Sequence, residues 1–491
     1  MATRWLTVPL LAFVLAGCGR GDDGAVQVAF IDTPESLFAD GLRLSAGAQH
    51  VRAATHAGLV TLDAQGDVIP ALADRWIVTD DGRSFIFRLR DGNWSDGSEL
   101  TAGSVRTALD DAIRALRGTS LGLDLAPIED VRAMAGRVVE IRLSAPVPML
   151  LQLLAQPELA LSHGRGDEAG GSGPMWLERD GETAVLTMKP PAARGIPEQP
   201  DWERYVRAIE LQAQSAEEAI ERFDEGALDL VLGGRIAALP LADTGPLSRG
   251  TVRIDPALGL FGHRVVRARG LLATAQGREA IAMAIDREAL IEPFNIGGWV
   301  PTTRVVPPGL PSDPGYIAER WIERTIEQTR AEATRRVAAW RSSSGGEARL
   351  TLALGQGPGL DLLFRELAAQ LATIGVRLER VPEGSAADFV LIDRVARYAE
   401  SRWFLNQFHC ALGNGMCSSE ADALVRDSIV QTDPNAKATL LAQAEAELTL
   451  ANVYIPFGSP LRFSLVRGDV QGFAGNAWAF HPLPPLAVIP R

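Results

Sequence analysis

Three cysteines carry the most reactive side chains of the chain, and two of them stand close together. Six residues separate Cys410 from Cys417. In an oxidising compartment, two thiols at such a spacing close a small loop through a disulfide. We predict this disulfide, with two buried free thiols as the alternative.

The third cysteine follows small residues near the N-terminus, where the expected chemistry is lipid attachment. The letters LAGC at residues 15–18 resemble the lipobox of a bacterial lipoprotein signal. The apolar run that they close has about 11 residues, and a membrane span needs roughly 20, which favours a signal peptide over a transmembrane anchor. We predict removal of residues 1–17, a lipid on Cys18 and a tether over residues 18–25. A plain cleaved signal is the alternative.

Side chains that hold metals or act as nucleophiles show no productive spacing. The six histidines are scattered, and only His409 beside Cys410 forms a suggestive pair. The glycine-rich residues 355–359 lack the Lys-Ser/Thr ending of a phosphate-binding loop. No Gly-x-Ser-x-Gly segment stands between a predicted strand and helix, as a nucleophile elbow requires. We therefore expect no metal, no cofactor and no enzymatic activity.

Composition narrows the class of protein further. The net charge of −13 disfavours nucleic acid as a partner, because the phosphate backbone is also negative. A hydrophobic content of 46% is typical of a folded protein. A chain of 491 residues is too long for one core and predicts two or three domains.

The elements that must position these residues follow from local patterns. Residues 84–90 and 138–143 alternate apolar and polar side chains, which predicts strands, and the Asp-Gly step at 81–82 predicts a hairpin turn. Thr101 is the expected N-cap of a helix, and the Asp-Pro step at 433–434 opens a last long helix. Strands and helices alternate along the chain, which indicates an α/β protein with mixed sheets.

An ordered series of turn-rich blocks extends through the chain. It begins with ALADRW, DDGRSF, FRLRDG, WSDG and LTA between residues 71 and 102. Further blocks follow at residues 171–175, 222–229, 278–287 and 369–376. Together they resemble the signature of the family 5 extracellular solute-binding proteins, which include the dipeptide-, oligopeptide- and nickel-binding components of ABC importers. The resemblance covers nearly all of residues 26–480.

The resemblance implies a two-lobed, α/β periplasmic-binding-protein type II fold with mixed sheets, a hinge and an extra subdomain on lobe I. We assign residues 26–55, 170–250 and 455–491 to lobe I, residues 56–169 to the inserted subdomain and residues 251–454 to lobe II. A ligand would be enclosed where the lobes meet, and closure around it is a hinge transition.

The same resemblance implies a function. We expect a monomeric, periplasmic, lipid-anchored substrate-binding protein of an ABC importer. It would capture a peptide-like or other small polar solute and deliver it to the permease in the inner membrane. The alternative is a divergent member that acts as a ligand sensor or scaffold rather than in transport.

One segment departs from the pattern of the peptide-binding members. These hold the α-amine of the peptide with an aspartate in a segment of the type Trp-x-x-Asp-Tyr-x-x-Pro-x-x-Phe-Leu. The matching residues 394–405 agree at Tyr398 and at the final Phe-Leu pair. Arg397, however, stands in place of the aspartate, Arg394 in place of the tryptophan and Ser401 in place of the proline.

The arginine inverts the charge expected at this site. A guanidinium repels an ammonium group and instead matches a carboxylate or phosphate bidentately. We therefore predict ligand contacts from Arg394, Arg397 and Tyr398, with an anionic or strongly accepting group opposite Arg397. In the alternative, Arg397 points at solvent or pairs with Glu400 or Asp393.

In the first lobe, residues 43–49 lie where family members offer backbone groups to the ligand. We therefore predict ligand contacts from Ser45, Gly47 and Gln49. An ordinary connecting loop is the alternative.

Overall fold

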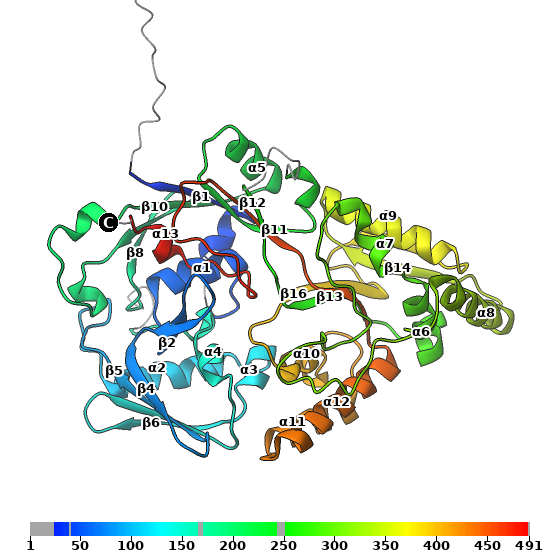
Figure 1. The fold of residues 1–491 in the computed structure, drawn as a ribbon, viewed down its shortest axis with the longest axis horizontal. Helices are drawn as coiled ribbons and strands as arrows, with labels where there is room; N and C mark the ends of the chain where they lie inside the picture. Colours follow the sequence, from blue (N-terminus) through cyan, green and yellow to red (C-terminus); the bar gives the residue numbers. More distant parts are fainter. Residues whose placement is uncertain (1–23, 39–40, 165–169, 243–250, 490–491) are drawn as a thin grey trace, which may run out of the picture.

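The computed structural model describes residues 24–38, 41–164, 170–242 and 251–489. The predicted signal peptide, Cys18 and most of the predicted tether lie outside the described residues. A seven-stranded and a five-stranded sheet, a four-stranded sheet and the two-stranded sheet β2-β3 organise the described residues. Figure 1 shows how the elements are arranged. No helix in the described ranges is both long enough and apolar enough to cross a membrane.

Lobe I, as the term is used from here, is the seven-stranded sheet with its helices. Its strands follow the order β12-β18-β11-β1-β10-β9-β8. Strand β1 runs parallel to β10 and β11, and its side chains are mostly buried, as expected of a strand covered on both faces. The bounds are β1 Val26–Ile31, β8 Met175–Asp180, β9 Thr183–Met188, β10 Ile209–Gln214, β11 Leu230–Arg235, β12 Val252–Ile254, β18 Arg462–Val466, α1 Ala46–Thr55, α5 Ala216–Asp224 and α13 Leu483–Leu486.

Lobe II is the five-stranded sheet of order β15-β14-β16-β13-β17 with its helices. Strands β14 and β15 run parallel, and helix α9 provides the crossover connection that two parallel neighbours need. The bounds are β13 Gly259–Val265, β14 Arg349–Leu354, β15 Arg377–Pro382, β16 Phe389–Val395, β17 Tyr454–Gly458, α6 Ala275–Ala284, α7 Arg287–Ile291, α8 Ile326–Ser344, α9 Pro358–Ala372, α10 Ser401–Asn406, α11 Ser419–Ile429 and α12 Pro434–Ala451.

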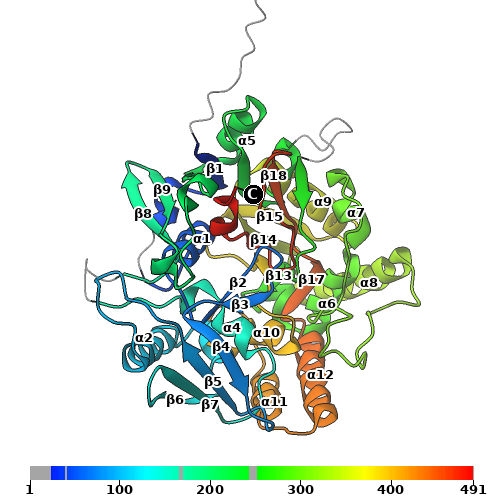
Figure 2. The same ribbon diagram turned by 60° about the vertical axis from the view of Figure 1, so that its left-hand side comes forward.

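The subdomain comprises residues 57–164 and is built on an antiparallel sheet of order β4-β5-β7-β6. Figure 2 shows this sheet beside helix α2. Gly82 takes the positive φ of 66° that the predicted hairpin turn requires. The bounds are β2 Val60–Leu62, β3 Val68–Pro70, β4 Ala73–Val78, β5 Ser84–Leu89, β6 Ile128–Met134, β7 Val138–Leu143, α2 Ala102–Ala115, α3 Ser120–Asp124 and α4 Leu150–Leu154.

The chain passes between the two large sheets twice, at residues 255–258 and 459–461. These crossovers move the predicted lobe boundaries by a few residues. Strand β12, which a boundary at residue 251 places in lobe II, pairs with β18 in lobe I. Strand β17, which a boundary at residue 455 divides, pairs with β13 in lobe II. Short strands at a crossover carry too little periodicity to reveal which sheet they join.

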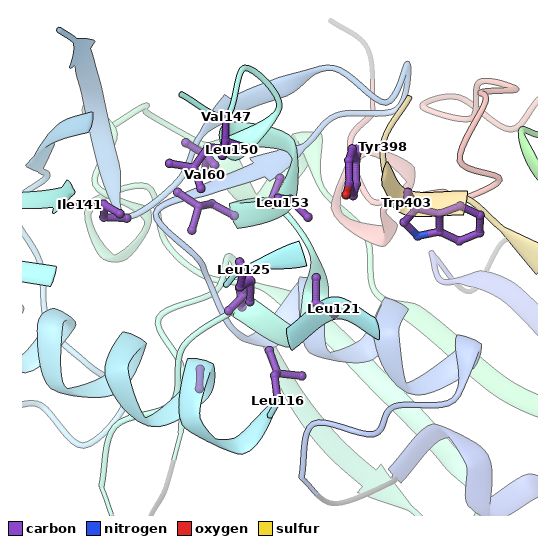
Figure 3. Close-up of a cluster of buried hydrophobic side chains, with 14 of the residues drawn as sticks. Val60, Leu116, Leu121, Leu125, Ile141, Val147, Leu150, Leu153, Tyr398 and Trp403 are labelled. Atoms are coloured by element: carbon purple, nitrogen blue, oxygen red, sulfur yellow. The ribbon is translucent and has the colours of Figure 1, made fainter. Parts of the chain in front are cut away.

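The subdomain and lobe II share one apolar core. Leu121 and Leu125, on and just after α3, belong to the same cluster of buried side chains as Tyr398 and Trp403 of lobe II. Figure 3 shows these side chains gathered where α3 approaches the segment that leads into α10. The two bodies therefore meet through a contact made largely of apolar side chains.

Candidate functional site

A cavity of about 480 Å³ lies where lobe I, the subdomain and lobe II meet. Its volume falls in the range of sites that hold small molecules. Lobe I contributes Phe30, Leu44, Ser45, Ala46, Gln49, His50, Gly233, Gly234, Arg235, Asp255, Arg462, Phe463, Ser464, Trp478, Ala479, Phe480 and His481. The subdomain contributes Leu62, Ser120, Gln156 and Pro157, and lobe II contributes Asp393, Arg394, Val395, Ala396, Arg397, Trp403 and Gln407.

The charge of the cavity is opposite in sign to that of the whole chain. Among the lining residues the charged side chains are Arg235, Arg394, Arg397, Arg462, Asp255 and Asp393. The whole chain has a net charge of −13, so the arginines are concentrated here against the general composition. A concave surface of one sign raises the local concentration of ligands of the other sign.

Arg397 forms an ion pair across the interface between lobe II and the subdomain. Its guanidinium donates to both carboxylate oxygens of Glu158, at 2.7 and 2.5 Å, and to Oε1 of Gln156 at 2.9 Å. Glu158 lies in the 3-10 helix η2, Pro157–Leu159, and its side chain is only 4% exposed. A carboxylate from the protein itself therefore faces Arg397.

The expected alternatives for Arg397 need correction. Glu400 pairs with Lys437 at 2.9 Å, and Asp393 pairs with Arg462 at 2.6 Å, so neither is the partner of Arg397. The side chain of Arg397 is 25% exposed rather than directed wholly at solvent. The partner comes from the subdomain, which local sequence cannot reveal.

Arg394 lines the same cavity without a carboxylate partner among the described residues. Its Nη1 donates to Oε1 of Gln407 at 3.1 Å. Gln407 is buried, and its amide nitrogen donates to the carbonyl of Trp403, which orients the acceptor oxygen toward Arg394. Desolvation and then the positive charge of Arg397 lower the pKa of Arg394, but an arginine remains charged at neutral pH.

Two further polar groups close the lobe I side of the cavity. Asp255 accepts from the backbone nitrogen of Asn476 at 3.0 Å and lies 3.2 Å from Nε2 of His481. His50 packs against Phe30 and Phe480. Burial lowers the pKa of His50 to about 4, so this ring is neutral at neutral pH.

Two of the three residues predicted in the first lobe reach the cavity. Ser45 is the N-cap of α1, accepting from the backbone of Ala48 at 3.0 Å. Gln49, one turn later on α1, donates to Glu158 at 3.2 Å. Gly47 lies outside the lining, because its Cα faces the core, where a Cβ would meet Leu37 at 2.8 Å.

Tyr398 is fully buried and does not line the cavity. Its hydroxyl donates to Asp124 of α3 at 2.8 Å, and Asn406 donates to the same oxygen at 2.7 Å. Burial raises the pKa of Asp124 to about 6. Tyr398 thus joins lobe II to the subdomain, and the prediction that it contacts a ligand needs correction. It follows Arg397 in the bend after β16, and its hydroxyl reaches Asp124 whereas the guanidinium of Arg397 reaches Glu158.

Several lining residues had no local signal in the sequence. Arg235, Asp255, Arg462 and His481 come from separate strands and loops of lobe I. Ser120 belongs to a Gly-x-Ser-x-Gly segment at residues 118–122, but this segment joins helix α2 to helix α3 rather than a strand to a helix. It therefore lacks the geometry of a nucleophile elbow.

The cysteine pair lies outside the cavity lining. Cys410 and Cys417 are joined in a disulfide, the first of the two alternatives. Nδ1 of His409, beside Cys410, lies 3.6 Å from a carboxylate oxygen of Asp422. Within the described residues, no group of three His, Cys, Asp or Glu side chains is placed to hold a metal ion.

Residues 67–408 match the family described as bacterial extracellular solute-binding proteins, family 5 Middle. The oligopeptide-binding protein OppA of Bacillus subtilis is 21% identical over 63% of this chain and 64% of its own length, a little under two thirds. The periplasmic oligopeptide-binding protein OppA of Salmonella typhimurium is 22% identical over 85% of this chain and 84% of its own.

Solved structures agree on the fold. OppA of Haemophilus influenzae, in complex with the peptide RPPGFSPFR, superposes with a TM-score of 0.81 at 17% identity, covering 95% of this chain and 100% of that one. The protein AgaA of A. tumefaciens R10, in complex with agropinic acid, gives a TM-score of 0.69 at 16% identity, covering 93% and 96%. The chain belongs to the family 5 extracellular solute-binding proteins of bacteria.

Proposed function

We propose that the protein is the substrate-binding component of an ABC importer and captures a small polar solute in the 480 Å³ cavity between its lobes. The observation that carries this proposal is the lining itself, to which lobe I, the subdomain and lobe II all contribute polar side chains. A solute held there contacts both lobes and the subdomain, which together shield it from water. Closure would then present the permease with a surface that depends on the bound solute.

The volume of the cavity favours a solute of small-molecule size. Proteins of similar structure bind ligands of different size: the H. influenzae protein is in complex with a nonapeptide and AgaA with agropinic acid. A cavity of 480 Å³ lies in the lower part of the range of small-molecule sites. The arginine at the position of the amine-binding aspartate also disfavours a peptide with a free α-amine.

Thermal unfolding of the mature protein tests solute capture. A ligand that binds only the native state stabilises it by mass action, by about 2.7 kcal/mol at a hundredfold excess over Kd. At least one member of a panel of peptides, sugars and organic anions should raise Tm. A flat response across the panel would instead support the sensor or scaffold alternative.

The lipid anchor is proposed from the sequence of residues 15–18. Two acyl chains on Cys18 would give a stable attachment to the membrane at the periplasmic side. The protein should partition into the detergent phase of Triton X-114, and Cys18→Ala should move it to the aqueous phase. A wild-type protein found in the aqueous phase would favour the plain cleaved signal.

A further inference from the structure

The cavity contains positive charge that the protein does not neutralise. Arg397 is paired with Glu158 and Arg462 with Asp393, each through contacts of 2.5 to 2.7 Å. Arg394 has only the neutral amide of Gln407. Arg235, the fourth lining arginine, is exposed and has no ion pair with a described residue either, but no buried side chain holds its guanidinium as Gln407 holds that of Arg394. A ligand would therefore meet a guanidinium already paired with a carboxylate at Arg397 and at Arg462, but a guanidinium without a carboxylate at Arg394.

Neighbouring positive charges make an anion beside Arg394 more favourable. The positive charge of Arg397 lowers the pKa of Arg394, after the larger effect of desolvation by the surrounding protein atoms. The charge of Arg394 in turn lowers the pKa of Arg264, after the larger effect of burial. Like charges held close in a partly desolvated site repel one another. A bound carboxylate or phosphate would relieve this repulsion.

The guanidinium of Arg394 is also held ready for such a group. Gln407 is 1% exposed, and its own amide nitrogen is fixed on the carbonyl of Trp403 at 3.1 Å. Its Oε1 takes one of the five N–H donors of Arg394, and the remaining donors form the fork that binds an oxyanion in two places. The side chain is exposed and lines the cavity, so a solute can reach it.

We propose that Arg394, rather than Arg397, binds an oxyanion of the solute, and that the substrate class is therefore a small organic molecule bearing a carboxylate or a phosphate. This inference rests on the proposed function, since it specifies the solute that the same cavity holds. Arg397 has a different task, because Glu158 already supplies its anion.

Two matched pairs of probes test the proposal by calorimetry and thermal unfolding. N-acetyl-alanyl-alanine carries a carboxylate that its C-terminal amide lacks, and glycerol 3-phosphate carries a phosphate that glycerol lacks. At least one anion should bind the wild type more tightly than its neutral partner, and the pair that responds distinguishes carboxylate from phosphate.

The variants locate the effect. Arg394→Gln should weaken binding of the responding anion by about 10- to 100-fold, as expected for the loss of a hydrogen-bonded charge. Arg426→Gln is the matched control, because Arg426 lies on α11 with 71% of its side chain exposed, and it should bind like the wild type. Gln407→Glu, which places a carboxylate on Arg394, should also weaken anion binding and guards against a folding defect in the first variant.

Two results would overturn the proposal while leaving solute capture intact. One is binding of the neutral probes with affinity equal to that of the anions. The other is unchanged anion affinity in Arg394→Gln. If no probe binds and native mass spectrometry of the protein from its own periplasm detects no copurified small molecule, the proposed function fails together with the anion assignment.

Discussion

At the scale of single residues, the ion pair between Arg397 and Glu158 explains how the chain tolerates a positive charge where the resemblance to the peptide-binding members predicts an aspartate. Glu158 accepts hydrogen bonds from Nη1 and Nη2 of the guanidinium and a third from Gln49. The three side chains come from lobe II, the subdomain and lobe I, so this one carboxylate ties all three bodies together. A buried carboxylate without its cation would be costly, and so would the cation without it.

Glu158→Gln should lower the free energy of unfolding by about 2 kcal/mol, because the charge of Arg397 then loses its partner in a mostly desolvated site. Urea unfolding measures the change. The exposed Glu347, with 78% of its side chain in solvent, provides the control, and Glu347→Gln should change the value by less than about 0.5 kcal/mol. Adding Arg397→Gln to Glu158→Gln should recover part of the loss, and further destabilisation would contradict the pairing.

Burial of His263 should make the free energy of unfolding depend on pH. It lies on β13 between Phe389 and Phe457, with neither ring nitrogen hydrogen-bonded, and burial lowers its pKa to about 3. The unfolded chain, with a pKa near 6.5, takes up the proton first as the pH falls. The free energy of unfolding should therefore decrease below pH 6.5, and by pH 5 the loss due to His263 is about 2 kcal/mol.

His263→Phe should remove that part of the acid sensitivity, since the apolar ring has no proton to gain. Urea unfolding at pH 7 and pH 5 gives the change in the free energy of unfolding between these pH values, which is compared for the variant and the wild type. His50 and His56, whose pKa values burial lowers to about 4 and about 3, will keep the variant partly acid-sensitive. A variant that loses as much stability as the wild type between these pH values would contradict the assignment.

At the scale of elements, the loop after α10 shows how a covalent bond and one backbone contact fix an otherwise irregular segment. The disulfide between Cys410 and Cys417 closes the loop, and the backbone nitrogen of Met416 donates to Val265 of β13 at 2.9 Å. Gly415 lies against the side chain of Arg264. The loop therefore supports β13, the strand that pairs with β16, which carries Arg394.

The double substitution Cys410→Ser with Cys417→Ser should lower the free energy of unfolding by about 2 kcal/mol, the entropy effect of a short closed loop. Binding of a cavity ligand should stay within about twofold of the wild type, because neither cysteine lines the cavity. Urea unfolding and calorimetry separate the two effects. A large loss of affinity without loss of stability would show that the loop acts on the site directly.

At the scale of the whole molecule, two short crossovers and one interface join the lobes and the subdomain. The crossovers at 255–258 and 459–461 are the covalent links between the large sheets. Across the interface, Arg397 meets Glu158, Tyr398 meets Asp124, and apolar side chains of α3 pack beside α10. The subdomain and lobe II are therefore held together by contacts that need no solute.

Removing these contacts should open the unliganded protein. The double variant Glu158→Gln with Tyr398→Phe should have a larger radius of gyration by small-angle X-ray scattering, because closure loses an ion pair and a buried hydrogen bond. A bound ligand should bring the value back toward that of the wild type. His263→Phe, which changes the interior of lobe II only, should scatter like the wild type, and equal values in all three proteins would mean that the apolar contact alone keeps the lobes together.

The sequence by itself was enough to predict individual strands, helix starts and turns. The strand at 138–143, the N-cap at Thr101, the hairpin turn at Gly82 and the helix opened by Asp433-Pro434 all occur as predicted. Periodicity, caps and turns act over a few residues, and the ordered blocks indicated the family because each block encodes such a local feature. The LAGC run likewise predicts lipid attachment without reference to the fold, and that attachment stays a prediction.

The partners within the site were decided only by the tertiary structure. Glu158 stands 239 positions before Arg397, and Asp124 stands 274 before Tyr398. No periodicity links such residues, because their contact depends on how the subdomain packs against lobe II. The sequence by itself identified the inverted charge at Arg397, whereas the packing of the lobes neutralised it with Glu158 and left Arg394 facing the cavity with no carboxylate partner among the described residues.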